Sequence, residues 1–188
     1  MDLYSLLSSY QPYNDQEEAD RKVMLDALMR YSDLYDRSNL VLHLTASSWI
    51  TNPSRDKILM IYHNIYHSWA WTGGHADGER DLLSVAVREA KEETGLHSVS
   101  PVSNKIFSIE TLTVNSHIRR GIYVPSHLHL NVTYLLEADD KESLKVKPDE
   151  NSDVAWFTPA GAVNACSEPW MQPIYRKLNE KLEALCKS

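Results

Sequence analysis

GGHADGERDLLSVAVREAKEETGL, residues 73–96, is the stretch of this 188-residue chain that decides the fold. Asp81 is a favourable N-cap, because its carboxylate can accept hydrogen bonds from the first backbone N–H groups of a helix that begins at Leu82. Gly95 can end that helix in the left-handed conformation, which residues with a Cβ rarely adopt. The pattern therefore predicts a helix between these two signals, with an apolar stripe formed by Leu83, Val87 and Ala90.

The carboxylates of Glu89, Glu92 and Glu93 are the chemical feature of this predicted helix. Their i, i+3, i+4 spacing places them on one helix face, where like charges cost about 0.2–0.5 kcal/mol per pair. A bound cation would reverse the sign of that interaction, and oxygen-rich acidic sites favour Mg²⁺ or Mn²⁺. Arg88 lies four residues before Glu92 and is predicted to hold its carboxylate in place.

Two glycines, Gly73 and Gly74, precede the helix. Glycine allows a backbone carbonyl or amide to approach a ligand closely, so we expect this segment to lie against a metal ion or a phosphate. His75 follows directly and is a candidate phosphate contact, with an ordinary turn residue as the alternative.

Together these residues resemble the Nudix box, G-x5-E-x7-R-E-U-x-E-E-x-G-U, in which U is a bulky aliphatic residue. The positions that match in register are Gly74, Arg88, Glu89, Glu92, Glu93, Gly95 and Leu96. Two positions depart from the pattern: Arg80 stands where the first glutamate is expected, with Glu79 one residue earlier, and Ala90 is small for the first U. The resemblance implies a Nudix-type α/β/α sandwich and a diphosphate hydrolase whose box glutamates bind divalent metal. It leaves open whether Glu79 takes the role of the missing glutamate.

The amino-acid composition limits the kinds of molecule that this chain is expected to bind. The chain carries 19 basic and 26 acidic residues, a net charge of −7 that argues against broad binding of nucleic acid or anionic membrane. A phosphate substrate is still compatible, because a bound metal inverts the local charge. Cys166 and Cys186 lack metal-ligand spacing and indicate a reduced, cytoplasmic protein. No signal peptide and no apolar run approaching a membrane span is recognisable, so no membrane partner is expected.

Outside the box, the pattern predicts strands on both sides and a helix near each end. Helices are expected over residues 15–31 and 168–187, and strands over residues 40–51, 56–67, 99–116, 127–138 and 153–158. This order predicts an α/β fold in which a mixed sheet lies between helices. We divide the chain into an N-terminal helical extension, residues 1–37, packed on a Nudix-like domain, residues 38–188, that includes the C-terminal helix.

One face of the strand over residues 127–138 is polar, because His127, His129, Asn131 and Thr133 alternate with apolar residues. The His-x-His pair is a candidate for metal or phosphate binding, and the alternative is a polar face packed under a loop. Since the strand follows the box, we include His127 and His129 with His75 among the candidate substrate-binding residues.

Two further groups flank the box. Glu150 is the candidate general base, because the resemblance implies a base on a loop outside the box, and Asp149 is the alternative. On the N-terminal side, Trp71 is a candidate for stacking on a nucleobase, together with Trp69 and Tyr66. A place in the core is the commoner role for such aromatic residues.

The leading hypothesis is a hydrolase that cleaves the diphosphate linkage of a nucleoside diphosphate derivative, a small-molecule phosphate substrate, with Mg²⁺ or Mn²⁺ as cofactor. The metal ligands would be Glu89, Glu92, Glu93 and Gly74, and the catalytic residues would be Glu93, Arg88 and Glu150. Two alternatives share the fold. One is an isopentenyl diphosphate isomerase-like enzyme, which uses a Cys and a Glu, and the other is a non-catalytic nucleotide-sensing domain, which would normally have lost box glutamates. The sequence leaves the substrate and homo-oligomerisation open.

Overall fold

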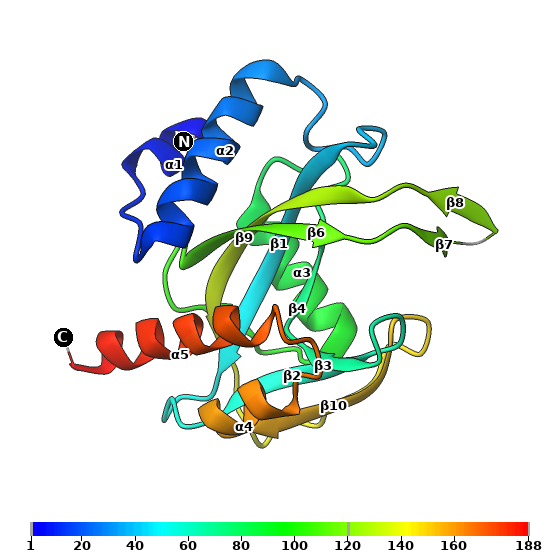
Figure 1. Ribbon diagram of the computed structural model, residues 1–188. Coiled ribbons are helices and arrows are strands. Elements are labelled where there is room, and N and C mark those ends of the chain that lie inside the picture. The colour runs from blue at the N-terminus through cyan, green and yellow to red at the C-terminus, as the bar shows by residue number, and fades with distance from the viewer. Residues whose placement is uncertain (1, 120, 188) are drawn as a thin grey trace.

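The computed structural model describes residues 2–119 and 121–187 and shows a curled, mixed β-sheet with helices on both sides (Figure 1). The helices are α1 (Leu3–Ser9), α2 (Asp15–Arg30), α3 (Leu82–Thr94), α4 (Pro159–Ala165) and α5 (Gln172–Lys187). The strands of the main sheet are β1 (Leu42–Thr51), β2 (Ile58–His63), β3 (Ser68–Ala70), β4 (Thr72–His75), β5 (Ser100–Pro101), β6 (Ser108–Val114), β9 (His127–Glu137) and β10 (Asn151–Phe157). β7 (His117–Arg119) and β8 (Ile122–Val124) form a separate antiparallel ribbon. The predicted α/β/α sandwich around a mixed sheet is confirmed.

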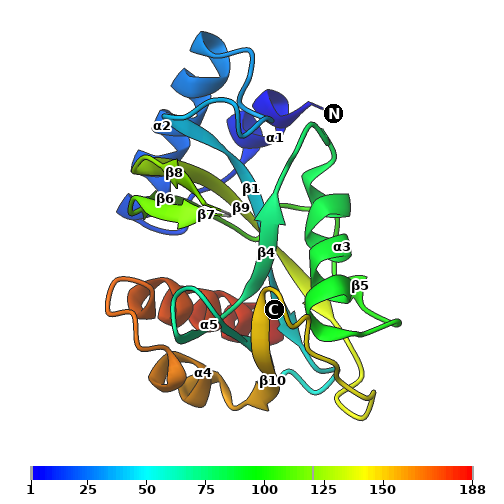
Figure 2. The same cartoon turned by 90° about the vertical axis from the view of Figure 1, so that its right-hand side faces the viewer.

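The parallel pair β1 and β9 forms the centre of the sheet, in register from Leu42 opposite Leu128 to Thr51 opposite Glu137. Their neighbours are antiparallel: β2 and β4 pair with β1, β5 and β6 pair with β9, and β10 pairs with β2. Helix α3 packs on β1 and β4, while α4 and α5 lie on the opposite side of the sheet (Figure 2). Because β4 leads into α3, the pairing of β4 with β1 fixes where the box helix begins.

The two sides of the sheet bury separate apolar cores. Met24 of α2, Ala90 of α3 and Leu130 of β9 belong to one core, and Trp49 of β1 and Tyr175 of α5 belong to the other. Each fully buried side chain of this kind stabilises the fold by about 1.5–3 kcal/mol, so α2 and α5 both contribute to the stability of the sheet. Within the described ranges, no helix is long and apolar enough to cross a membrane.

Several element boundaries differ from the sequence-based prediction. The strand predicted over residues 56–67 ends at His63, because residues 64–67 form a turn in which His67 has a φ of 49°. The strand predicted over residues 99–116 is divided into β5 and β6, since residues 103–105 between them are exposed. Helices α1 and α4 are short additions, capped by Asp2 and Thr158.

The buried face of α3 is also wider than the predicted stripe. Leu82, Val85 and Ala86 are fully buried, and Leu83 and Val87 are only partly buried at its edge. The buried face of α3 therefore extends from Ala90 of the predicted stripe across the side that carries Glu93.

Candidate active site

Strand β4 and helix α3 bring the box glutamates against the glycine pair. The helix begins and ends as predicted: the Asp81 carboxylate accepts hydrogen bonds from N–H groups of the first turn, and Gly95 has a φ of 73°. Gly73 and Gly74 lie in β4 rather than in a loop. A Cβ added to Gly74 would lie 2.5 Å from Cδ of Glu89, so only glycine permits this approach of strand and carboxylate.

Glu93 is the buried carboxylate of the site. Its side chain is 2% exposed, and Oε2 accepts a hydrogen bond from the Gly73 N–H at 2.9 Å. Burial raises the pKa of Glu93 to about 8, and the Gly73 N–H offsets this shift only in part. Burial also raises the pKa of Glu89. A divalent cation would stabilise the charged form of both groups, so this donor set fits a hard metal ion.

Glu92 occupies a more exposed position than its two partners. Its Oε2 accepts a hydrogen bond from Nζ of Lys147 at 2.9 Å, and the same ammonium lies 3.1 Å from the Glu150 carboxylate. Burial lowers the pKa of Lys147, but the hydrogen bonds to Glu92 and Glu150 outweigh burial and the net shift is upward. Lys147 therefore links the third box glutamate to the loop that carries the candidate base. The contact of Lys147 with Glu92 could not be predicted from the sequence, because nothing local relates Lys147 to α3.

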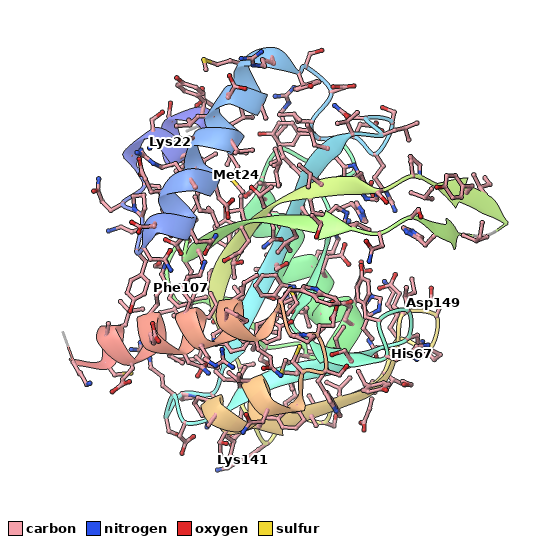
Figure 3. All side chains as sticks on the ribbon, viewed as in Figure 1. Lys22, Met24, His67, Phe107, Lys141 and Asp149 are labelled. Carbon is pink, nitrogen blue, oxygen red and sulfur yellow. The ribbon has the colours of Figure 1, made fainter. Side chains whose placement is uncertain are left out.

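The loop before β10 carries Glu150 near Glu89 and Glu93. The Glu150 carbonyl accepts a hydrogen bond from the Asn64 N–H at 3.0 Å, which docks this loop on the turn between β2 and β3. Figure 3 shows Asp149 and His67 on these two segments at the same edge of the molecule. Burial is the largest cause of the raised pKa of Glu89 and of Glu93, and the charge of Glu150 adds to both shifts. The Asp149 side chain is exposed. Of the two candidate bases, Glu150 is thus the one within electrostatic range of the site.

Arg88 contacts a different glutamate from the one predicted. Its Nη2 donates a hydrogen bond to Oε1 of Glu89 at 3.0 Å. The prediction that Arg88 holds Glu92 is therefore wrong, and the Glu92 carboxylate is paired with Lys147 instead. Arg88 orients the carboxylate that lies against Gly74.

The residues at the unusual position of the box lie at the start of α3, about two helical turns before Glu89. The Arg80 guanidinium lies 5.0 Å from the centre of the Tyr35 ring. Oε1 of Glu79 accepts a hydrogen bond from the Asp81 N–H at 2.9 Å and braces the turn into the helix. Both side chains have contacts that are separate from the glutamate cluster.

The polar face of β9 meets histidines from two other strands. His43 of β1 lies opposite His129 in the parallel pair, and His75 ends β4. The ring centres of these three residues lie within 5.0 Å of one another, and the Nε2 atoms of His127 and His129 are 3.2 Å apart. The three predicted histidines are thus brought together with His43. His43 could not be predicted from the sequence, because only the register of β1 against β9 places it beside His129.

Further along the polar face of β9, the polar residues are buried and belong to an ionic network. Asn131 donates a hydrogen bond to Glu110 at 3.0 Å. Nζ of Lys177, from α5, lies 3.0 Å from Glu110 and 3.2 Å from Glu17 of α2. This half of the face is packed, and the network joins the N-terminal and C-terminal helices to the sheet.

The aromatic candidates do not line the glutamate cluster. Trp71 is 9% exposed, and its ring packs edge-on against Tyr175 with centres 5.5 Å apart. The prediction that Trp71 stacks on a nucleobase is therefore wrong, because α5 covers its ring. Trp69 packs on Phe157, and Tyr66, in the turn after β2, stacks on His63 at the end of that strand.

The sandwich fold and the acidic helix against a glycine strand define a class, the hydrolases that act on diphosphate bonds. A family model described as the NUDIX domain matches residues 41–178, and the chain belongs to this family. The protein is therefore a Nudix-type hydrolase, and the family acts on small phosphate-containing substrates.

Individual relatives agree with this assignment. A probable DHNTP pyrophosphohydrolase of Lactococcus lactis is 25% identical over 142 residues, which span 76% of this chain and 81% of that protein. Among solved structures, the Ap4A hydrolase of C. elegans has a TM-score of 0.52 at 17% identity and covers 77% of this chain and 97% of its own. The dihydroneopterin triphosphate pyrophosphohydrolase of E. coli has a TM-score of 0.53 at 13% identity, with coverages of 71% and 92%. At these identities, the structural likeness shows the fold.

Proposed function

We propose that the protein is a metal-dependent hydrolase that cleaves the diphosphate linkage of a nucleoside diphosphate derivative. The supporting observation is the pair of carboxylates held against the glycine strand β4, the buried Glu93 and the partly buried Glu89. Glu89, Glu92, Glu93 and the backbone of Gly74 would hold Mg²⁺ or Mn²⁺. When bound, the ion neutralises diphosphate oxygens and lowers the pKa of a coordinated water molecule.

The protein's own residues then have separate roles. Glu150 accepts the proton of the attacking water, and its carboxylate is held 3.1 Å from Nζ of Lys147. Arg88 holds Glu89 in position for the metal. The substrate phosphate chain lies along β4, where His75 follows the glycines and His127 and His129 border the same edge. The proposed catalytic residues are therefore Glu93, Arg88 and Glu150, the same three that the sequence predicts.

Two relatives guide the choice of substrates. The L. lactis protein is named for DHNTP, and the C. elegans fold neighbour is named for Ap4A. We propose a substrate in which a base-like ring is joined to a diphosphate or longer phosphate chain. Because Trp71 is buried, it is not available to stack on this ring.

The experiment that tests this function is a product screen. The metal-stripped protein is incubated with Mg²⁺ and with nucleoside diphosphate sugars, dinucleoside polyphosphates, NADH, ADP-ribose, nucleoside triphosphates and dihydroneopterin triphosphate, and products are separated by chromatography. We expect cleavage within the phosphate chain of at least one compound and no cleavage in EDTA. Binding of a nucleotide without cleavage would favour the sensing domain, and isomerisation of an isoprenoid diphosphate would favour the isomerase.

A further inference from the structure

Four histidines from three strands form a compact cluster near the start of β1. The candidate ligand nitrogens of His43, His75 and His129 all lie within 4.8 Å of one another. A tetrahedral ion with Zn–N distances of about 2.0–2.1 Å requires nitrogens ~3.3 Å apart. Side-chain rotations that move each nitrogen by about 1 Å would close the present arrangement around an ion.

His43 is the buried member of the cluster, with 4% of its surface exposed. Its Nδ1 lies 3.1 Å from the Asn39 carbonyl oxygen, so Nδ1 carries the ring proton and donates it, which leaves the lone pair on Nε2. Within the described part of the chain, this buried Nε2 has no hydrogen-bond partner. A buried polar atom without a partner destabilises the fold by about 1–3 kcal/mol. The position of Nε2 therefore favours binding of a ligand, such as a metal ion, that accepts its lone pair. A ring nitrogen fixed by a backbone carbonyl is the usual support of a metal-binding histidine.

His127 fixes the orientation of His129. Nδ1 of His127 donates a hydrogen bond to the Pro125 carbonyl at 2.8 Å, so its Nε2 accepts the proton of the His129 Nε2–H. The lone pair of His129 is then on Nδ1. His43 and His129 thus each present a ring lone pair, which is the form of imidazole that binds metal.

We propose that His43, His75 and His129 bind a transition-metal ion, with Zn²⁺ preferred, at a site separate from the box glutamates. Imidazole ligands suit Zn²⁺, Cu²⁺ and Ni²⁺, whereas the carboxylates of α3 suit Mg²⁺ and Mn²⁺, so the two sites select different ions. Three histidines leave a fourth position for water or for a substrate oxygen. Because His75 directly follows Gly74, which lies against Glu89, the ion would sit beside the proposed path of the phosphate chain. The three histidines would then contact the substrate indirectly, through the bound metal ion.

The test is a metal titration of the tag-free, metal-stripped protein in excess Mg²⁺, which occupies the carboxylate site. Co²⁺ is the spectroscopic probe, and Zn²⁺ is added afterwards as a competitor. We expect one Co²⁺ per chain with the visible absorption of a nitrogen-ligated ion, lost when Zn²⁺ displaces it. His75→Gln and His129→Gln should each weaken Zn²⁺ binding at least about tenfold, the smallest effect typical of disturbing a metal site. His75 ends its strand and is only partly buried, so its variant should keep the fold, as thermal unfolding can verify.

Two matched variants distinguish this site from other sources of metal binding. His97→Gln replaces an exposed histidine elsewhere and should leave the Zn²⁺ affinity unchanged. Glu93→Gln removes a proposed Mg²⁺ ligand and should also leave it unchanged, so the proposal stands or fails independently of the hydrolase assignment. Parent-like affinity in His75→Gln and His129→Gln, or loss of Zn²⁺ binding in Glu93→Gln, would overturn the histidine site.

Discussion

Glu93→Gln should make the metal-free protein more stable at neutral pH while it removes most of the activity. Burial raises the pKa of Glu93 from 4.5 to about 8, so the folded protein holds a proton that the unfolded chain releases. Glutamine has nearly the same shape, and its amide oxygen can still accept the hydrogen bond from the Gly73 N–H. The substitution therefore removes the ionisation penalty and keeps the contact.

The pH window follows from the direction of the shift. A carboxyl group with a raised folded pKa contributes its full stability below pH 4.5 and loses that contribution as the pH rises towards 8. At about 1.4 kcal/mol per pH unit, the loss between pH 4.5 and pH 7 is about 3 kcal/mol. In EDTA, the free energy of unfolding of the parent should thus fall across this interval relative to that of Glu93→Gln.

The assay is urea denaturation followed by tryptophan fluorescence at several pH values between 5 and 8. Glu92→Gln is the matched control, since Glu92 is exposed and paired with Lys147, and it should keep the pH dependence of the parent. Added Mg²⁺ should stabilise the parent more than Glu93→Gln. Parallel pH profiles of the parent and Glu93→Gln in EDTA would refute the reasoning from burial.

Three further outcomes are expected. Glu150→Gln should lower kcat by about 10²–10⁴-fold with unchanged Mg²⁺ affinity, measured by steady-state kinetics and calorimetry, and a normal rate would move the base elsewhere. Gly74→Ala should keep the fold but weaken Mg²⁺ binding by at least about tenfold, because the new Cβ displaces the Glu89 side chain; unchanged affinity would place the metal away from Glu89. Burial opposes ionisation of Glu17, but the hydrogen bond from Lys181 and other contacts lower its pKa to about 2, so the stability it contributes is present above pH 4.5 and is lost as the pH falls towards 2. Acid titration of the melting temperature should show this loss in the parent and not in Glu17→Gln.

The box helix could be predicted because its signals are local. Asp81 caps the first turn and Gly95 adopts the left-handed conformation, and both effects depend on adjacent residues alone. The glycines before the helix were expected to lie against a metal ion or a phosphate, but the close approach of Gly74 to Glu89 was not predicted. Local chemistry thus predicted the helix, its ends and the acids that it carries.

The partners of these groups could not be predicted, because they come from distant parts of the chain. Lys147 reaches Glu92 from a loop that follows β9, whereas Arg88 contacts Glu89 instead of the residue that i, i+4 spacing favoured. His43 meets His129 only because β1 and β9 pair in parallel with one particular register. Burial of Trp71 likewise depends on where α5 docks.

The central claim is that the carboxylates of α3 support metal-dependent cleavage of a diphosphate bond. The most direct measurement is the initial rate of phosphate-chain cleavage against Mg²⁺ concentration for the parent, Glu93→Gln and Glu79→Gln. We predict that the parent is inactive without Mg²⁺, that Glu93→Gln loses activity by about 10²-fold or more, and that Glu79→Gln, which alters a turn about two helical turns from Glu89, matches the parent. Cleavage by the parent in EDTA, or a parent-like rate in Glu93→Gln, would contradict the account.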